Sequence, residues 1–347
     1  MMTRRRWLAL TAAGVASRAQ AADALFERID THVHLNRPSQ AIVDGLQSAN
    51  WRVLSISDSR AIGDQPGDLE PQLKGNAELH RRSRGRVAWA GSFDPRGWEE
   101  AGFATRVIAS LQQQFRDGAI AVKIWKNIGM AVRAKSGGYL MPDNPVLFPI
   151  YEMLEREGRT LAAHLAEPDG AWLPLDDHNP ERGFYGSHPE WHMYGREGAP
   201  SKASILEARD RAIARFPRLR VVGCHLGSNE ENLEELAQRF DRLPNFAVDL
   251  ASRIRYFAAG DRAKASAFLV KYRDRIVYGT DFTLDPNGDD QRAWASLSGQ
   301  HDRDWQYLTS AEPMRYGRTE TQGLGLPAEV AKKIFRDNAV HWYPGIA

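Results

Sequence analysis

Two histidines separated by one residue, His32 and His34, are the most informative chemical feature of this sequence. They belong to the run Asp-Thr-His-Val-His, which is typical of a β-strand, where residues i and i+2 point to the same side. Two neutral imidazoles on one side can share a metal ion. Such pairs also occur in half-buried strands without a metal, so the prediction of a metal site depends on further ligands.

Three more polar residues each stand at the end of a short apolar run. They are His164, His225 and Asp281. In a barrel of parallel strands the catalytic groups collect where the strands end, so residues from separate strands would meet there. The alternative is that each histidine is buried against a backbone carbonyl and the aspartate caps a helix. Convergence of this many residues favours the metal site.

The elements that would position these residues alternate along the whole chain between short apolar runs and longer stretches of helical period. The apolar runs are residues 28–35, 51–57, 86–93, 119–125, 160–165, 219–226, 246–250 and 275–280. Eight such units predict an α/β fold, a closed (β/α)8 TIM barrel, with long loops after strands five and eight. An open doubly wound sheet would carry a Gly-rich turn after its first strand, where this chain has the histidine pair.

The first 21 residues have the pattern of a signal peptide. Arg4, Arg5 and Arg6 precede an apolar run too short to span a membrane, and Ala-Gln-Ala follows at residues 19–21. The segment is similar to a twin-arginine leader, which predicts export of a folded protein to the periplasm. Residues 22–347 are then expected to form a single domain without a stable membrane span.

Charge and cysteine content exclude several classes of function. The chain has 46 Lys and Arg against 44 Asp and Glu, so a formal charge of +2 gives no reason to expect nucleic acid as a partner. Cys224 is the single cysteine, which excludes an intramolecular disulfide and a thiolate cluster. Strand alternation predicts that Cys224 points outward against the helices. A small-molecule substrate fits best, and a homo-oligomer is compatible with the sequence.

With these motifs in place, the mature chain resembles the metal-dependent amidohydrolase superfamily, in particular the amidohydrolase-related branch that also contains aminocarboxymuconate semialdehyde decarboxylase-like enzymes and lactonases. The resemblance implies a (β/α)8 barrel with a divalent metal, commonly zinc. It implies that His32, His34, His164 and Asp281 are the metal ligands. It also matches His225 to the histidine of strand six.

The resemblance and the donor types together predict a metal-dependent hydrolase. Metal-bound hydroxide would cleave an amide, a lactone or a related ester bond in a small molecule. Asp281 would be the general base, while His225 donates a hydrogen bond to the oxyanion or holds the water. The alternative is a metal-dependent non-oxidative decarboxylase of a small acidic substrate, which the same ligands could serve.

Lys123 in the fourth strand is open to three interpretations. Alternation turns its side chain toward the barrel interior. In binuclear members of the superfamily a strand-four lysine is carboxylated and bridges two metals, which would give two Zn²⁺ ions in place of one. The other two interpretations are an anchor for a substrate carboxylate and a structural ion pair.

Other residues could shape the pocket. Glu167 follows His164 closely and could support the site or cap a loop. His188 and His192 lie in an aromatic-rich segment and could contact substrate or pack within a lid. Arg253 and Arg255 follow the seventh strand and could pair with an anionic substrate, because guanidinium groups bind carboxylates in a bidentate manner, or they could be solvated.

Overall fold

The computed structural model of the protein describes residues 26–62 and 67–347. The predicted signal peptide, residues 1–21, lies outside the described residues. The central feature is a parallel sheet in which each strand pairs with the next one along the chain. Its strands are β1 (Arg28–His34), β2 (Trp51–Ile56), β3 (Val87–Ser92), β4 (Ala121–Ile124), β5 (Thr160–Ala163), β6 (Val221–Gly223), β7 (Phe246–Asp249) and β8 (Ile276–Val277). All eight lie within the runs predicted from the sequence.

The segment that starts with β8 closes the sheet into a barrel. Its continuation, β9 (Phe282–Thr283), pairs in parallel with β1 on the side away from β2. The segment between β8 and β9 is also hydrogen-bonded to β1. The Thr31 N–H of β1 donates to the Tyr278 carbonyl at 2.9 Å, and the Asp281 N–H donates to the His32 carbonyl at 2.7 Å. The predicted (β/α)8 barrel is therefore confirmed, and its closing seam contains both His32 and Asp281.

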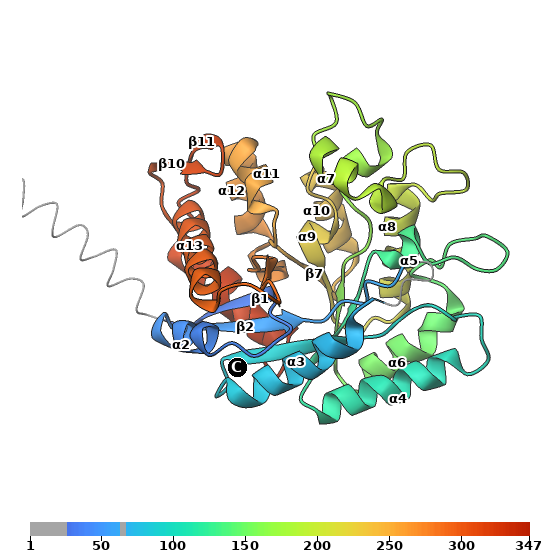
Figure 1. The fold of residues 1–347 in the computed structure, drawn as a ribbon. Helices are drawn as coiled ribbons and strands as arrows, with labels where there is room; N and C mark the ends of the chain where they lie inside the picture. Colours follow the sequence, from blue (N-terminus) through green and yellow to red (C-terminus); the bar gives the residue numbers. More distant parts are fainter. Residues whose placement is uncertain (1–25, 63–66) are drawn as a thin grey trace, which may run out of the picture.

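Helices cover the outside of the barrel (Figure 1). They are α2 (Gln40–Ser48), α3 (Leu69–Arg82), α4 (Phe103–Arg116), α6 (Phe148–Arg156), α8 (Lys202–Arg215), α10 (Leu233–Arg242), α12 (Arg262–Lys271), α13 (Asp290–Thr309), α14 (Ala328–Lys332) and α15 (Asn338–Trp342). Several begin at polar N-cap residues, and the Ser201 and Asp261 side chains accept backbone N–H groups of the first turn. Among the described residues, no helix is both long enough and apolar enough to cross a membrane.

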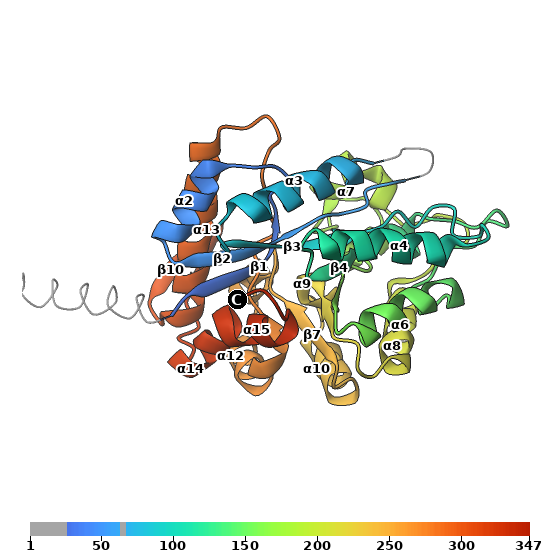
Figure 2. The same ribbon diagram turned by 90° about the horizontal axis from the view of Figure 1, so that it is seen from below.

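Of the three apolar clusters among the described residues, two hold most of the barrel together. The larger one fills the space between the sheet and the surrounding helices. The smaller one occupies the barrel interior, where Ile29, Leu54 and Val222 pack with Trp342 and Tyr343 from the C-terminal end of the chain. Figure 2, a view from below, shows α15 and the C-terminus in front of the strands at this end of the barrel. This end of the barrel is closed by packing, so the polar residues gather at the opposite end.

The two long insertions follow β5 and β8, as predicted. The first contains α7 (Arg182–Ser187) and short 3₁₀ turns at Asp169–Trp172 and Pro189–Trp191. The second contains the 20-residue helix α13 and the antiparallel hairpin of β10 (Pro313–Tyr316) and β11 (Thr319–Gln322), which the sequence analysis did not anticipate. In Figure 1 these insertions rise on either side of the upper end of the molecule.

Asp304 on α13 gives a test of this packing. Its buried carboxyl accepts the hydroxyls of Tyr278 at 2.9 Å and Tyr316 at 2.7 Å. Burial raises the pKa of Asp304 to about 6, against the opposing effect of the tyrosine hydrogen bonds. Between the pKa of Asp304 in the unfolded chain and its raised pKa in the folded protein, the folded state binds more protons. The stabilisation from protonated Asp304 is therefore lost as the pH rises toward 6.

We therefore expect Asp304→Asn to flatten the pH dependence of stability. Relative to wild type, its free energy of unfolding should rise by roughly 3 kcal/mol between about pH 4 and about pH 7, because one pKa unit corresponds to about 1.4 kcal/mol. Urea unfolding at a series of pH values measures this difference. Parallel curves for the two proteins would contradict the expectation.

Candidate active site

His32 and His34 lie at the end of β1, and both are buried. The Nδ1 atom of His32 is 2.8 Å from the Asp249 carboxylate, and Nδ1 of His34 is 2.9 Å from the Ile56 carbonyl. Both partners are acceptors, so each histidine in its neutral form carries its proton on Nδ1. The Nε2 lone pair of each ring is left available to bind a ligand.

Asp281 lies opposite these two Nε2 atoms. Its Oδ1 is 3.4 Å from Nε2 of His32 and 3.3 Å from Nε2 of His34, and its Oδ2 accepts the Ser252 hydroxyl at 3.1 Å. Burial would raise the pKa of Asp281, but the neighbouring imidazoles of His225, His34 and His32 hold it well below its usual range. The backbone φ of Asp281 is +67°, which turns the side chain back toward β1.

His164 and His225 complete the cluster. Their ring centroids are 4.3 Å apart, and Nδ1 of His225 donates to the Ala251 carbonyl at 2.9 Å. Burial lowers the pKa of both histidines well below the usual value, and nearby positive charge adds to the effect. Both are therefore neutral imidazoles. Nε2 of His164 is buried without a hydrogen-bond partner and lies 3.6 Å from the Glu167 carboxylate.

This arrangement fits a divalent metal ion. Donor atoms of His32, His225 and Asp281 lie within 4.8 Å of one another. Nitrogen lone pairs and a carboxylate oxygen face each other, the Lys123 ammonium lies 3.4 Å from Nε2 of His32, and His164 packs against His225 in the same cluster. Imidazole and carboxylate are the donors that zinc prefers alongside thiolate. This donor set contains His225 in place of His34 and His164, so the predicted ligand set of His32, His34, His164 and Asp281 stays a prediction.

The position of Cys224 corrects the sequence analysis, because the thiol faces the barrel interior. Lys123 Nζ donates to Cys224 Sγ at 3.1 Å and lies 3.4 Å from Nε2 of His32. Strand alternation does not apply at Cys224, since β6 ends at Gly223 and a left-handed turn follows. Burial lowers the pKa of Lys123, but Cys224 and the acidic groups Asp58 and Asp249 raise it above its usual value. Lys123 is thus a buried cation beside the candidate ligands.

A cavity of about 450 Å³ opens onto the cluster. His164, His225 and Asp281 line its floor, and Phe184 from the first insertion and Tyr316 from the second line its walls. The two insertions therefore form the cavity together. Lys123 is 1% exposed and does not line it, which disfavours the role of Lys123 as a substrate anchor.

In the described part of the chain, three cations line the cavity, namely Lys126, Arg253 and Arg255. Arg253 is buried, and its Nε donates to Glu230 at 3.1 Å. Lys126 pairs with Glu167, which also accepts the Tyr185 hydroxyl at 3.2 Å. Lys126, like Asp249, was missed by the sequence analysis. The available signal was its place directly after the fourth strand, where barrel side chains reach the site.

The remaining predicted residues lie farther from the cluster. His188 is exposed and stacks on Phe184, with ring centroids 4.5 Å apart. Nε2 of His192 is 2.8 Å from the Leu173 carbonyl within the same insertion. Neither histidine lines the cavity, and each contacts another residue of the same insertion. Arg255 is at the cavity rim and donates to Glu181 at 2.9 Å.

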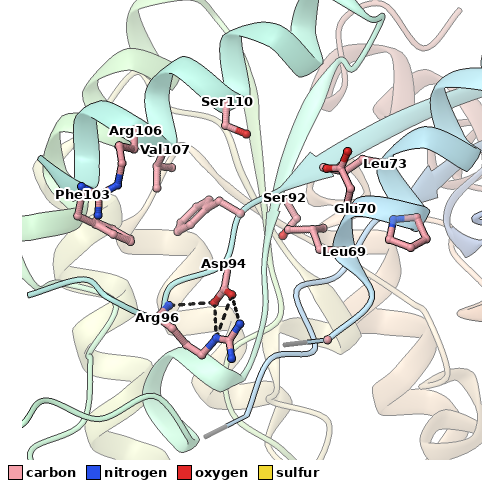
Figure 3. Close-up of a pocket in the computed structure, with 13 residues that line it drawn as sticks. Leu69, Glu70, Leu73, Ser92, Asp94, Arg96, Phe103, Arg106, Val107 and Ser110 are labelled. Atoms are coloured by element: carbon pink, nitrogen blue, oxygen red, sulfur yellow. Dashed lines mark hydrogen bonds and ion pairs between the residues drawn. The ribbon is translucent and has the colours of Figure 1, made fainter. Parts of the chain in front are cut away.

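A second cavity, of about 480 Å³, lies between α3 and α4 at the end of β3 (Figure 3). Leu69 and Glu70 line one side and Phe103 and Arg106 the other. The candidate metal ligands do not line this cavity, so it is separate from the site described above.

The structure is a closed (β/α)8 barrel with imidazoles and a carboxylate at the carboxyl ends of its strands, where barrel enzymes place their active sites. A family model described as Amidohydrolase matches residues 127–345. The chain therefore belongs to the amidohydrolase family. The matched range contains His164, His225 and Asp281, and the β1 histidines precede it.

Solved structures show the same fold at low sequence identity. A TIM-barrel protein from Bordetella bronchiseptica is 13% identical with a TM-score of 0.52, over 91% of this chain and 97% of that one. A probable 2-pyrone-4,6-dicarboxylic acid hydrolase from Acinetobacter baumannii is 10% identical with a TM-score of 0.51, over 92% and 99% of the two chains. The 2,6-dihydroxybenzoate decarboxylase from Rhizobium is 12% identical with a TM-score of 0.52, over 92% and 99%. No curated protein matches the sequence significantly.

Proposed function

We propose that the protein is a metal-dependent hydrolase that cleaves an amide, a lactone or a related ester bond in a small molecule. The observation that carries the proposal is the meeting of Asp281 with Nε2 of His32 and His34 at the floor of a substrate-sized cavity. The carboxylate of Asp281 is 29% exposed, so it can reach both the buried nitrogens and a molecule in the cavity.

In this proposal the ligands are His32, His34, His164 and Asp281. A bound divalent ion would supply Lewis acidity, which lowers the pKa of a coordinated water toward about 7 and polarises a carbonyl. Asp281 accepts the proton of the attacking water and passes it to the leaving group. Since Nδ1 of His225 donates to Ala251, its Nε2 is an acceptor. This favours holding the water over donating to the oxyanion.

Arg253 is the group best placed to select an anionic substrate. It lines the cavity as a buried cation, with its Nε donating to Glu230 at 3.1 Å and its Nη1 to the Ser252 carbonyl at 3.5 Å. A guanidinium binds a carboxylate through paired N–H groups. We therefore expect Arg253→Gln to raise KM for a carboxylate-bearing substrate by roughly 10- to 100-fold, in line with about 1.5–3 kcal/mol for a charged hydrogen bond.

The control for Arg253→Gln must account for the Glu230 carboxylate, which the substitution leaves buried without its cation. Glu230 would lose its buried partner, so the double variant with Glu230→Gln should recover stability without recovering KM. An uncharged substrate analogue should show little change in KM. Equal KM changes for charged and uncharged substrates would contradict the role of Arg253.

Decarboxylation of a small acidic substrate is the second candidate, and the cations Arg253 and Lys126 in the cavity favour it. Mass spectrometry of zinc-loaded protein with lactones, amides and aromatic carboxylic acids separates the two reactions. Hydrolysis adds one water to the substrate, whereas decarboxylation releases one carbon dioxide. Substrates that only lose carbon dioxide would overturn the proposal of a hydrolase.

We also propose that the protein is exported through the twin-arginine route. The proposal is supported by the leader-like residues 1–21, with Arg4 and Arg5 ahead of the apolar run. Replacing both arginines with lysine should retain the protein in the cytoplasm in cell fractionation. Unchanged periplasmic recovery would contradict this route.

A further inference from the structure

Asp249 lies at the end of β7, and both of its carboxylate oxygens are hydrogen-bonded to residues of the candidate metal centre. It is fully buried. Its Oδ2 is 2.8 Å from Nδ1 of His32. Its Oδ1 accepts the backbone N–H groups of His225 at 2.7 Å and Ala251 at 3.1 Å. One side chain thus joins the β1 histidine to the histidine after β6.

The His225 contact is made at a left-handed turn. The φ angles of His225, Leu226 and Ser228 are +58°, +55° and +59°, a region that costs an L-residue about 1–2 kcal/mol. The turn brings His225 into the cavity and Cys224 into the barrel. Such a backbone persists only where its surroundings hold it. Asp249 holds its start, and Arg209 holds its end by donating to the Gly227 carbonyl at 2.6 Å.

The His32 contact determines which ring nitrogen carries the proton. A carboxylate can only accept, so it requires the proton of neutral His32 on Nδ1 and leaves Nε2 with a lone pair toward Asp281. Space at this point is restricted, since a Cβ on Gly279 would lie 2.8 Å from the His32 Cβ. The ring is therefore fixed by packing at its base and by Asp249 at its Nδ1 edge.

We propose that Asp249 is a positioning residue of the metal centre, which sets the tautomer of His32 and the backbone turn of His225 through one carboxylate. This inference rests on the proposed metal-dependent function. Hydrogen-bond partners behind metal ligands commonly change metal affinity about 10- to 100-fold when they are removed. Asp249 acts through His32 and His225 and does not line the cavity.

Asp249→Asn tests the proposal with little change in volume. The amide oxygen can still accept the His225 N–H, so the amide nitrogen then faces Nδ1 of His32. This nitrogen is a donor, and His32 must move its proton to Nε2, the atom that faces Asp281. We expect nitrogen NMR of the metal-free variant to show His32 as the Nε2–H tautomer, with the signal assigned by its loss in His32→Gln. In competition with a chelating dye, zinc affinity should fall about 10- to 100-fold.

Asp304→Asn is the matched control, because Asp304 is also a buried aspartate with two hydrogen-bonded partners, but these are tyrosines. It should leave the His32 tautomer and zinc affinity unchanged. Retention of the Nδ1–H tautomer in Asp249→Asn, or zinc affinity within twofold of wild type, would overturn the proposal. If Asp249→Asn does not fold, the His32 tautomer in metal-free wild type tests the proposal instead. An Nε2–H tautomer of His32 in that protein would also overturn the proposal. The tautomer is read without metal, so failure of zinc binding in wild type would count against the proposed function alone.

Discussion

Asp281→Asn is expected to abolish measurable turnover while the protein stays folded. A general base contributes about 10²- to 10⁴-fold to a rate, and in the proposed function Asp281 combines that role with a place among the ligands. Its Oδ1 lies within 3.4 Å of Nε2 of both His32 and His34. An amide keeps an oxygen for these contacts but cannot accept and release a proton at neutral pH. The loss should therefore appear in kcat, and Asp281→Ala should show it as well.

The control for this prediction is Asp285→Asn. Asp285 is exposed, stands four residues later in the same segment and does not line the cavity. Its replacement should leave turnover unchanged. Metal content of each variant must be measured beside the rate. Wild-type turnover in Asp281→Asn or Asp281→Ala with metal retained would contradict the role of Asp281 as general base.

Metal removal is the second change with a large expected effect, here on stability. Without an ion, the lone pairs of His32 and His34 face the carboxylate of Asp281 in a buried site. A ligand that binds only the folded state stabilises it by about 4 kcal/mol at roughly 1,000 times its Kd. We therefore expect a chelator to lower Tm by several degrees and zinc to restore it.

Two histidine variants distinguish stabilisation by zinc bound at the candidate site from stabilisation by zinc bound elsewhere on the protein. His34→Gln removes a candidate ligand, so zinc should no longer raise Tm. His192→Gln removes a histidine of the insertion that does not line the cavity, so the zinc-dependent rise should persist. Thermal unfolding with and without zinc measures both. An equal zinc response in His34→Gln and wild type would show that the ion binds elsewhere.

The barrel and the cluster could be predicted because both follow from periodicity. Residues i and i+2 of a strand share a side, which brings His32 and His34 together. Parallel strands end at one rim, which brings His164 and Asp281 to them. Neither argument needs the three-dimensional structure. The hydrogen bonds of Tyr278 and Asp281 to β1, which close the barrel, follow from the same sequential order of strands.

The features that were missed depend on departures from that periodicity. Cys224 turns inward because the strand ends one residue earlier and the backbone becomes left-handed. Helix α13 was not predicted because its buried face includes His301 and Asp304 as well as Leu297 and Leu308, which obscures the apolar period. Asp249 is hydrogen-bonded to His32 of β1 and to His225 in the turn after β6, a relation that no local spacing encodes. The placement of His188 and His192 depends on loop geometry in the same way.

Metal content per chain, measured by elemental mass spectrometry, tests the central claim most directly. The mature wild-type protein should hold one divalent ion, and His32→Ala and His164→Ala should both lose it. Two ions per chain, reduced in Lys123→Ala, would instead make Lys123 a bridging ligand. No metal in wild type after reconstitution would contradict the account, because the convergence of histidines and Asp281 would then be structural.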